Sequence, residues 1–341
     1  MTSCWLPYYH AEILTDGTVR PCCKYQGDWI PSIDQYTSKD RSDFNQAVLP
    51  SQCDACKVDA NSFSYRKHRT IEFVKRGWRE PTEPSLRNLN ISIDNVCASS
   101  CLQCSPKQST TIGHLLGQPI RLSWDLNLLD PYLGSIEHMT ISGGEPLQSP
   151  RLVDLCTKLS NTQIKTIAIP TGLAKVRTQN IQALKNLNKP IYCRVSIDAP
   201  WPLNEWIRGC DQDDWLRGYD QVNSFNIAWQ ITIGAYNIFA LPELLDYIET
   251  VNPNRHIQPS PIIWPESMNS KQLPKHIKQQ IIDKLLSYTP RPNAKEIIDT
   301  ALNLLREPPT LDWERCQSDI ERLPSLRGCT ETLDDFFKRY L

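Results

Sequence analysis

Three cysteines within eight residues are the part of this 341-residue chain whose spacing most plainly allows chemistry. Cys97, Cys101 and Cys104, the cysteine trio, lie in the stretch NVCASSCLQC. Thiolates at such spacing can hold an iron–sulfur cluster. Three ligands on a four-iron cluster leave one iron open to a small molecule, as a catalytic zinc keeps one open position. The alternative is a structural zinc site with a distant fourth ligand such as a histidine.

A second group of cysteines precedes the first. Cys4 and Cys22 flank Gly17 in the pattern Cys-x12-Gly-x4-Cys, and the pair Cys53 and Cys56 follows with two residues between them. Four cysteines can hold a four-iron cluster without an open iron, and they close a tetrahedral zinc site equally well. These four cysteines, the cysteine quartet, are therefore candidate ligands of a second metal centre.

The bulk composition bounds the class of protein. The chain contains 13 cysteines, an odd number, and the clustering of reduced cysteines in a long chain favours metal binding over disulfides. The formal net charge of -1 gives no field that would attract nucleic acid or a membrane surface. No apolar run approaches the roughly 18 residues that span a bilayer, and no secretory signal is visible. We therefore expect a cytoplasmic protein.

The elements that must position the trio alternate along the chain. The expected strands cover residues 86–94, 139–142, 166–169, 191–197, 228–233 and 257–263. Helices are expected at 180–187 and 241–250, and another is expected to begin with Ser149 as N-cap and Pro150 at its first position. Repeated strand–helix units predict a parallel sheet, and right-handed crossovers favour a barrel or part of one. The trio follows the first strand, where active sites of such folds gather.

The segment before these units predicts a hairpin and a helix. Asp16-Gly17 between β-forming runs is a hairpin signal, and such a turn brings Cys4 and Cys22 toward the same end of a small sheet. Cys23 is an alternative ligand to Cys22, but the spacing from Gly17 favours Cys22. We predict three domains: residues 1–80, residues 85–265 and a helical extension over residues 266–341.

The expected helix at 62–76 carries the basic run Arg66-Lys67-His68-Arg69. A solvated helix face is the simpler interpretation of this run. A patch that binds an acidic substrate is the alternative.

The trio and a second motif together resemble the radical S-adenosylmethionine (SAM) superfamily. The second motif is the stretch 142–146, SGGEP, at the end of the second expected strand. The resemblance covers residues 86–265 and implies an α/β fold, a partial (β/α)6 barrel. Many members carry an aromatic residue immediately before the third cysteine, where this chain has Gln103. The resemblance implies that SAM binds the open iron and is cleaved reductively to a 5′-deoxyadenosyl radical.

The resemblance also suggests residues that contact SAM. Gly143 and Gly144 lack Cβ atoms and allow close backbone approach to a ligand, and the Glu145 region would bind the SAM ammonium. Ser196 and Asp198 are candidates for the ribose or the methionine carboxylate. Their alternative is a strand-end turn with Asp198 as a local cap. The remaining candidates are weaker: Asn237 as a SAM contact, Cys210 as a thiol at the barrel mouth, and Thr171-Gly172 as a turn rather than a site.

The quartet resembles the auxiliary-cluster modules called twitch and SPASM domains. Four cysteines suffice for one further [4Fe-4S] cluster, which fits the shorter twitch form. In better-known members the module follows the barrel, whereas here it precedes it. A cluster with four protein ligands has no open iron, which favours electron transfer over substrate binding.

The resemblance favours an enzyme that modifies a peptide, by crosslinking, epimerisation, oxidation or splicease-type excision. The peptide would add a strand to an exposed sheet edge. A flavodoxin or ferredoxin would donate electrons, and a partner protein could present a leader peptide. The alternatives are dehydrogenation of a small molecule such as an aminocyclitol, and a non-catalytic zinc scaffold. RNA modification fits the neutral charge less well.

Overall fold

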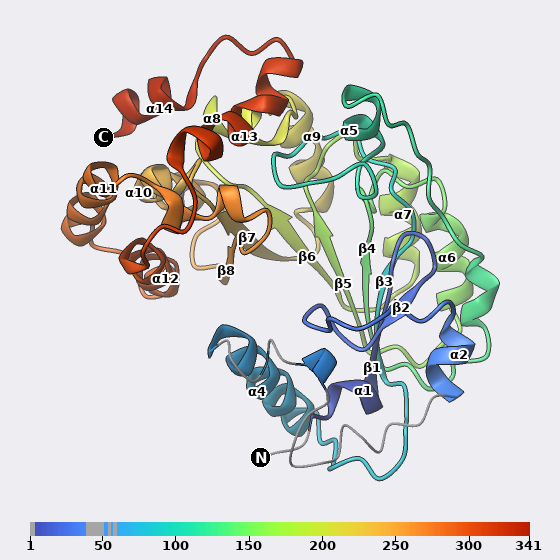
Figure 1. Cartoon of the computed structure of the whole chain (residues 1–341). Helices are drawn as coiled ribbons and strands as arrows, with labels where there is room; N and C mark the ends of the chain where they lie inside the picture. Colours follow the sequence, from blue (N-terminus) through green and yellow to red (C-terminus); the bar gives the residue numbers. More distant parts are fainter. Residues whose placement is uncertain (1–3, 39–50, 54–55, 57–59) are drawn as a thin grey trace.

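The computed structural model describes residues 4–38, 51–53, 56 and 60–341, and all that follows concerns these residues. They form one eight-stranded sheet that curves with its helices on the outside (Figure 1). Its strands in spatial order are β2 (Val19–Arg20), β1 (His10–Ile13), β3 (Asn88–Ser92), β4 (His138–Ser142), β5 (Thr166–Thr171), β6 (Ile191–Ser196), β7 (Asn226–Ile233) and β8 (Ile257–Pro261). Neighbours from β1 to β8 are parallel, and β2 is antiparallel to β1. The expected α/β fold with a partial barrel is confirmed.

Side chains alternate between the two faces of this sheet. On β5, Ile167, Ile169 and Thr171 are buried, whereas the residues between them are half-buried. The same alternation occurs on β6 and β7. Because the period is two, one face packs its Ile, Val and Leu side chains against the outer helices. The other, concave face carries Asn, Thr, Ser, Gln and Arg side chains.

The outer helices follow the strands in turn. They are α5 (Thr110–Leu115), α6 (Leu152–Leu159), α7 (Thr178–Asn186), α8 (Leu203–Arg208), α9 (Gln212–Val222) and α10 (Leu241–Val251). The sequence analysis placed α7 and α10 well and the start of α6 wrongly. Helix α6 begins after Arg151. The Ser149 hydroxyl accepts from the Arg151 N–H over 3.1 Å and donates to Asp94 Oδ2 over 2.6 Å. Its hydroxyl is thus engaged with the end of β3.

The expected hairpin forms around Asp16 and Gly17, and it joins the barrel sheet. Strand β1 pairs in parallel with β3, with His10 opposite Asn88, so the amino-terminal segment extends the same sheet. Gly17 has a φ of +84°, a left-handed conformation that suits glycine. The other helices of this segment are α1 (Leu6–Tyr9), α2 (Ile33–Ser38) and α4 (Ala60–Lys75). The domain limits 1–80, 85–265 and 266–341 stay a prediction.

The carboxy-terminal segment packs back onto the barrel. Its helices are α11 (Lys275–Ser287), α12 (Lys295–Arg306), α13 (Trp313–Leu326) and α14 (Leu333–Tyr340). Figure 1 shows α13 and α14 near α8, and Trp206 of α8 donates from Nε1 to the Glu331 carbonyl over 3.0 Å. The Trp206 ring also meets Phe336 edge-on, with centroids 5.4 Å apart. Within the described residues, every helix is too short or too polar to cross a membrane.

Candidate cysteine centres

The trio lies in the loop that follows β3, at the carboxyl ends of the parallel strands. Gly143 and Gly144, just after β4, lie directly against this loop. A Cβ on Gly143 would stand 2.4 Å from the Asp94 carbonyl oxygen, and one on Gly144 would stand 2.5 Å from that of Val96. The backbone N–H groups of Gly144 and Glu145 donate to the same two carbonyls, over 2.9 and 2.8 Å. The two glycines therefore allow the cysteine loop to pack directly against the end of β4. This contact fixes the position of the backbone that leads into Cys97.

Hydrogen bonds hold the start of the loop in place. The Cys97 carbonyl accepts from the hydroxyls of Thr110 and Thr111, over 3.3 and 2.7 Å, at the start of α5. The next N–H, that of Ala98, donates to Gln148 Oε1 over 2.8 Å. The fully buried Asn95 donates from Nδ2 to two carbonyls and accepts from the Leu122 N–H over 2.9 Å. The loop conformation thus rests on protein contacts alone.

The three thiols differ in their surroundings. Cys101 is buried, and Cys97 and Cys104 are partly buried. A hydrogen bond with Cys104 and the guanidiniums of Arg208 and Arg327 together lower the pKa of Cys101 to about 7, against the effect of burial. Burial raises the pKa of Cys97 to about 12. Cys101 is therefore the thiol most readily converted to the thiolate, which is the form that binds metal.

A buried ion pair lies beside Cys101. Arg208, the last residue of α8, donates to Asp198 over 2.8 Å between Nη2 and Oδ2, and both side chains are buried. Its Nη1 lies 3.9 Å from the Cys101 sulfur, and Asp198 helps to raise the arginine pKa. Cys210 is buried close by, and burial raises its pKa to about 12. Arg208 was missed by the sequence analysis; the signal was a lone arginine in the apolar stretch before Gly209.

Asp198 and Asn237, suggested as SAM contacts, are engaged with the protein. Asp198 Oδ1 accepts from the Thr232 N–H over 2.9 Å, and its carbonyl accepts from Asn237 Nδ2 over 2.7 Å. Asn237 Oδ1 in turn accepts from the Gly234 N–H over 2.8 Å. Together they fasten the ends of β6 and β7. Ser196, at the end of β6, is half-buried on the concave face.

Glu145 bridges the ends of β4 and β5. Its Oε1 accepts from Thr171 Oγ1 and the Leu147 N–H, over 2.8 and 3.0 Å, and its Oε2 accepts from the Gly172 N–H over 2.7 Å. Burial raises the pKa of Glu145, and these hydrogen bonds oppose the rise. Thr171-Gly172 is thus both a turn and a partner of Glu145, so the sequence analysis underestimated it.

An aromatic side chain reaches the trio from a different strand. Tyr236, fully buried after β7, donates to Gln103 Oε1 over 3.2 Å. Burial strongly raises the pKa of Tyr236, and Asp198 adds to the rise. Gln103 occupies the position where the resemblance led us to expect an aromatic residue. Tyr236 therefore brings an aromatic ring to that position from 133 residues away in sequence.

Arg327, directly after α13, contacts the trio loop from the carboxy-terminal segment. It donates from Nη1 to Ser100 Oγ over 3.2 Å and from Nη2 to the Trp206 carbonyl. A Cβ on Gly209 would stand 2.1 Å from Ser100 Oγ and 2.2 Å from Arg327 Nη1, so this contact requires glycine. Arg327 was also missed, because nothing local marks a contact spanning 227 residues.

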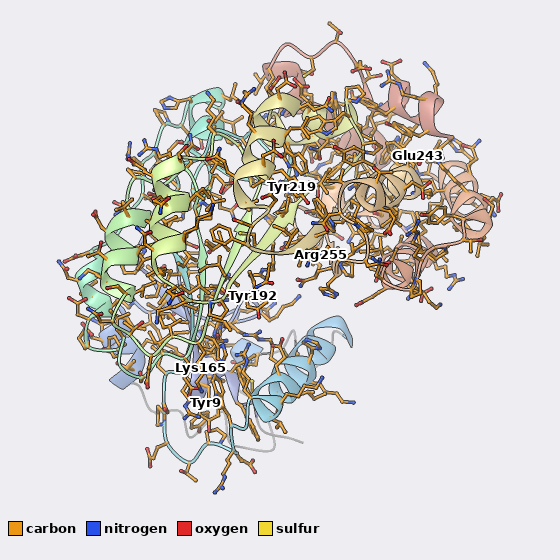
Figure 2. The ribbon with its side chains drawn as sticks, turned by 180° about the vertical axis from the view of Figure 1, so that it is seen from behind. Tyr9, Lys165, Tyr192, Tyr219, Glu243 and Arg255 are labelled. Atoms are coloured by element: carbon orange, nitrogen blue, oxygen red, sulfur yellow. The ribbon has the colours of Figure 1, made fainter. Side chains whose placement is uncertain are left out.

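The quartet comes together in a separate, apolar cluster. Cys4, Cys22, Cys53 and Cys56 are all buried in the quartet cluster, which also contains Trp5, Leu6, Tyr8, Tyr9, Phe73 and Trp78. Burial raises the pKa of Cys22, and the neighbouring Cys4 and Cys53 contribute. Cys23 is exposed. The cluster lies at the amino ends of the strands. The ring centroids of Trp78 and His138, the first residue of β4, are 5.9 Å apart, and Figure 2 shows Tyr9 and Lys165 at this same end of the molecule.

The charges around the trio would suit an anionic iron–sulfur cluster, although the three thiols are not drawn together around a metal position. It offers three thiols from one loop, and two arginines lie next to Cys101. The Nε atoms of both Arg208 and Arg327 are buried without a hydrogen-bond partner among the described residues, which suits a negatively charged neighbour. Over the same residues, no three His, Cys, Asp or Glu side chains are grouped so as to hold a metal ion.

Comparisons with known proteins give structural likenesses only. No protein-family model matches this sequence, and no curated protein sequence matches it. Among solved structures, anSMEcpe with bound AdoMet aligns with a TM-score of 0.42 at 12% identity, over 58% of this chain and 59% of that chain. Streptococcus suis SuiB bound to precursor peptide SuiA aligns with a TM-score of 0.40 at 14% identity, over 67% and 51%. Each alignment thus spans less than two thirds of the other chain, and we base the assignment of function on the site itself.

Proposed function

We propose that this chain is a radical SAM enzyme that modifies a peptide. One observation carries the proposal. The trio follows the first barrel strand at the carboxyl edge of the sheet, and Gly144 and Glu145 are hydrogen-bonded directly to its loop. The two motifs of the resemblance are therefore one structural unit.

In this proposal Cys97, Cys101 and Cys104 hold a [4Fe-4S] cluster and leave one iron open. When bound, the cluster and SAM supply a 5′-deoxyadenosyl radical by reductive cleavage of SAM. The chain's own residues position and shield this site. Arg208 and Arg327 balance negative charge beside Cys101, and a buried charge needs such a partner.

The candidate SAM contacts take different roles. Gly143 and Gly144 set the position of the cysteine loop, because each lies directly against its backbone. Glu145 and Asp198 keep their carboxylates on protein partners, so each acts by holding strand ends. Ser196, half-buried at the end of β6, stays a candidate SAM contact, whereas Tyr236 is fully buried and bonded to Gln103.

The quartet is proposed to hold a second [4Fe-4S] cluster that relays electrons. Four buried cysteines with aromatic neighbours leave no open ligand position. The quartet cluster contacts His138, the first residue of β4, whereas the trio loop contacts the residues just after β4. The concave face of the sheet therefore extends between the two centres.

A peptide fits this concave face. Its half-buried side chains include Asn90, Thr140, Thr166, Arg194 and Gln258. They offer donors and acceptors along several strands, as an extended backbone requires. We propose a flavodoxin or ferredoxin as electron donor.

The first experiment is anaerobic iron and sulfide analysis with low-temperature EPR, with and without SAM. Wild type is compared with the Cys97/Cys101/Cys104→Ala variant. We expect about eight irons in wild type and about four in the variant. A SAM-sensitive EPR signal and 5′-deoxyadenosine formation are expected only in wild type.

Cys156→Ala is the matched control, because Cys156 lies in the core away from both groups. It should keep all the iron. Zinc without iron in anaerobically purified wild type would refute the radical SAM assignment. Four irons in wild type and none in the variant would refute the second cluster alone.

A further inference from the structure

A cavity of about 570 Å³ lies between helix α4 and the concave face of the sheet. It is far from the trio, because its strand residues are the early ones, such as Asn88 and His138. Helix α4 contributes Arg69, Glu72 and Arg76, and α12 contributes Glu296. In Figure 1, α4 and α12 lie at the open side of the sheet.

Three residues that line this cavity keep a buried donor nitrogen without a hydrogen-bond partner among the described residues. These atoms are Arg69 Nε, Arg76 Nη1 and Asn88 Nδ2. Asn88 is 3% exposed, so water reaches it poorly. Buried donors are nearly always paired in folded proteins, so three unpaired ones at one cavity indicate an acceptor that binds there.

The two arginines are held by their neighbours. Residues 69, 72, 73 and 76 follow helical spacing and so share one side of α4. The guanidinium of Arg69 lies 5.6 Å from the centre of the Phe73 ring, and that of Arg76 lies 5.6 Å from that of Trp78. Glu72 also accepts from Arg69 Nη1 over 2.6 Å. Phe73 and Trp78 belong to the quartet cluster, so its packing positions both arginines.

The side chains that line the cavity carry a net positive charge that could balance one negative charge on a ligand. Three arginines, the third being Arg194, face two glutamates, Glu72 and Glu296. His138 adds no positive charge near pH 7, because burial and the nearby Arg76 lower its pKa to about 4. The excess of one cation suits a monoanion such as a carboxylate better than a phosphate dianion.

We propose that this cavity binds a carboxylate of the substrate, through Arg69, Arg76 and Asn88. The proposal rests on the proposed function and narrows it to substrates that carry an acidic group. The carboxylate can belong to an Asp or Glu side chain or to a peptide carboxy terminus.

The position of the cavity sets the spacing within the substrate. The four steps from His138 to Ser142 along β4 cover about 13 Å at the usual rise of a strand. An extended peptide anchored at the cavity therefore reaches the trio edge about four residues away. The acidic residue and the modified residue should be separated by that interval.

The structure also shows which side chains of the basic run Arg66-Lys67-His68-Arg69 are exposed and which face the sheet. Lys67 and His68 are exposed, as a solvated face requires, whereas Arg69 turns toward the sheet. The side chain of Arg66 lies outside the described residues. The acidic-substrate alternative thus depends on Arg69, joined by Arg76 two turns later.

The test uses three N-acetylated tetrapeptides and isothermal titration calorimetry on the full chain at low salt, without SAM. Two peptides are C-amidated and differ only in one Glu or Gln side chain. The third has no acidic side chain and ends in a free carboxylate. We expect at least one carboxylate peptide to bind at least tenfold more tightly than the Gln peptide, and the stronger one identifies the source of the carboxylate.

Variants then assign the binding to the cavity. Arg76→Gln and the near-isosteric Asn88→Asp should each weaken carboxylate binding at least tenfold, and Arg76→Lys should weaken it less. Arg217→Gln, at an exposed arginine of α9, should leave it unchanged. Equal binding of all three peptides, no binding at millimolar concentration, or full binding by both cavity variants would each overturn the proposal.

This outcome is separable from that of the proposed function. Peptide binding is measured without SAM, whereas the radical SAM assignment depends on iron content, EPR and 5′-deoxyadenosine. A chain that forms 5′-deoxyadenosine yet shows no carboxylate preference would contradict only the cavity proposal. A chain with the preference but no iron would contradict only the enzyme.

Discussion

The two cysteine groups of this chain are built in opposite ways. The trio occupies eight consecutive residues, and polar groups from α5, α8 and the carboxy-terminal segment hold its loop. The quartet gathers cysteines from separate stretches into an aromatic, apolar cluster. The proposed roles suit this difference. A loop held by polar contacts and flanked by charges suits an open metal site, and ligands shielded from water suit a closed electron carrier.

This difference predicts that metal stabilises the two sites unequally. Hydrogen bonds from several elements fix the trio loop. The quartet segments are held mainly by apolar packing, together with backbone contacts such as that of Gln26 with Gln52. Binding free energy at a site that is absent from the unfolded chain becomes folding free energy. The predictions below test this contrast, from the largest expected effect to the smallest.

Loss of a quartet ligand should have the largest effect on folding. We expect Cys22→Ala to lose about four irons and on the order of 5 kcal/mol or more of unfolding free energy. The exposed neighbour provides the control, and Cys23→Ala should change neither. Iron per chain and anaerobic urea unfolding are the measurements. If Cys23→Ala loses the iron instead, Cys23 is the ligand and the expected spacing from Gly17 is wrong.

Breaking the ion pair beside the trio should come second. Arg208→Met leaves Asp198 buried without its cation, which should cost about 3–5 kcal/mol of unfolding free energy. Arg217→Met removes an exposed ion pair with Asp214 and should cost about 0–1 kcal/mol. Urea unfolding of the metal-free protein measures both. Similar values for the two variants would mean that charge does not hold the trio end together.

Adding one methyl group under the trio loop should have a smaller effect. A Cβ on Gly144 meets the Val96 carbonyl at 2.5 Å, so Gly144→Ala should cost about 1–3 kcal/mol and lower iron occupancy at the trio. Gly134→Ala is the matched control, since a Cβ there has no atom within 4 Å. Unfolding and iron analysis on both variants check this. Full occupancy in Gly144→Ala would show that the loop is not preset.

Acid should weaken the quartet end by the smallest amount. Burial and the guanidiniums of Arg69, Arg76 and Arg20 together lower the pKa of His10 to about 3, against the Asn88 carbonyl. A base with a lowered pKa stabilises the fold above its unfolded pKa of about 6.5, and this stability falls as pH drops toward 3. Between pH 7 and 5.5 the loss due to His10 should be about 1.3 kcal/mol. His10→Gln should reduce the total loss by that amount, and urea unfolding at both pH values measures the difference.

The sequence predicted the strands of the sheet more accurately than it predicted the residues around the cysteine trio. Most of the six barrel strands are short runs that alternate between buried and half-buried residues, and each was found within a few residues. The start of α6 was placed too early: the Ser149 hydroxyl accepts from the Arg151 N–H and donates to Asp94, 55 residues earlier, and the helix begins only at Leu152. The pairing of β1 with β3 was also not anticipated, since nothing near His10 indicates Asn88 as its neighbour.

Long-range contacts explain the missed residues of the site. Arg208 lies 107 residues from Cys101, and Tyr236 lies 133 residues from Gln103. An arginine after the apolar pair Trp206-Ile207 is visible in sequence, but its partner is not. Motifs of consecutive residues were recognised because their chemistry is local, and the charges that tune them come from elsewhere in the fold.

The contact between Arg327 and Ser100 has a consequence for synthesis. Residue 327 follows residue 100 by 227 positions. At ribosomal rates of about 5–20 residues per second, the trio loop is synthesised roughly 11–45 s before Arg327. During that interval the cysteines are already made, while the segment that closes over them is not. In the proposed function, iron and sulfide would reach the open loop most easily within this time window, and slowing translation after the barrel should lengthen it.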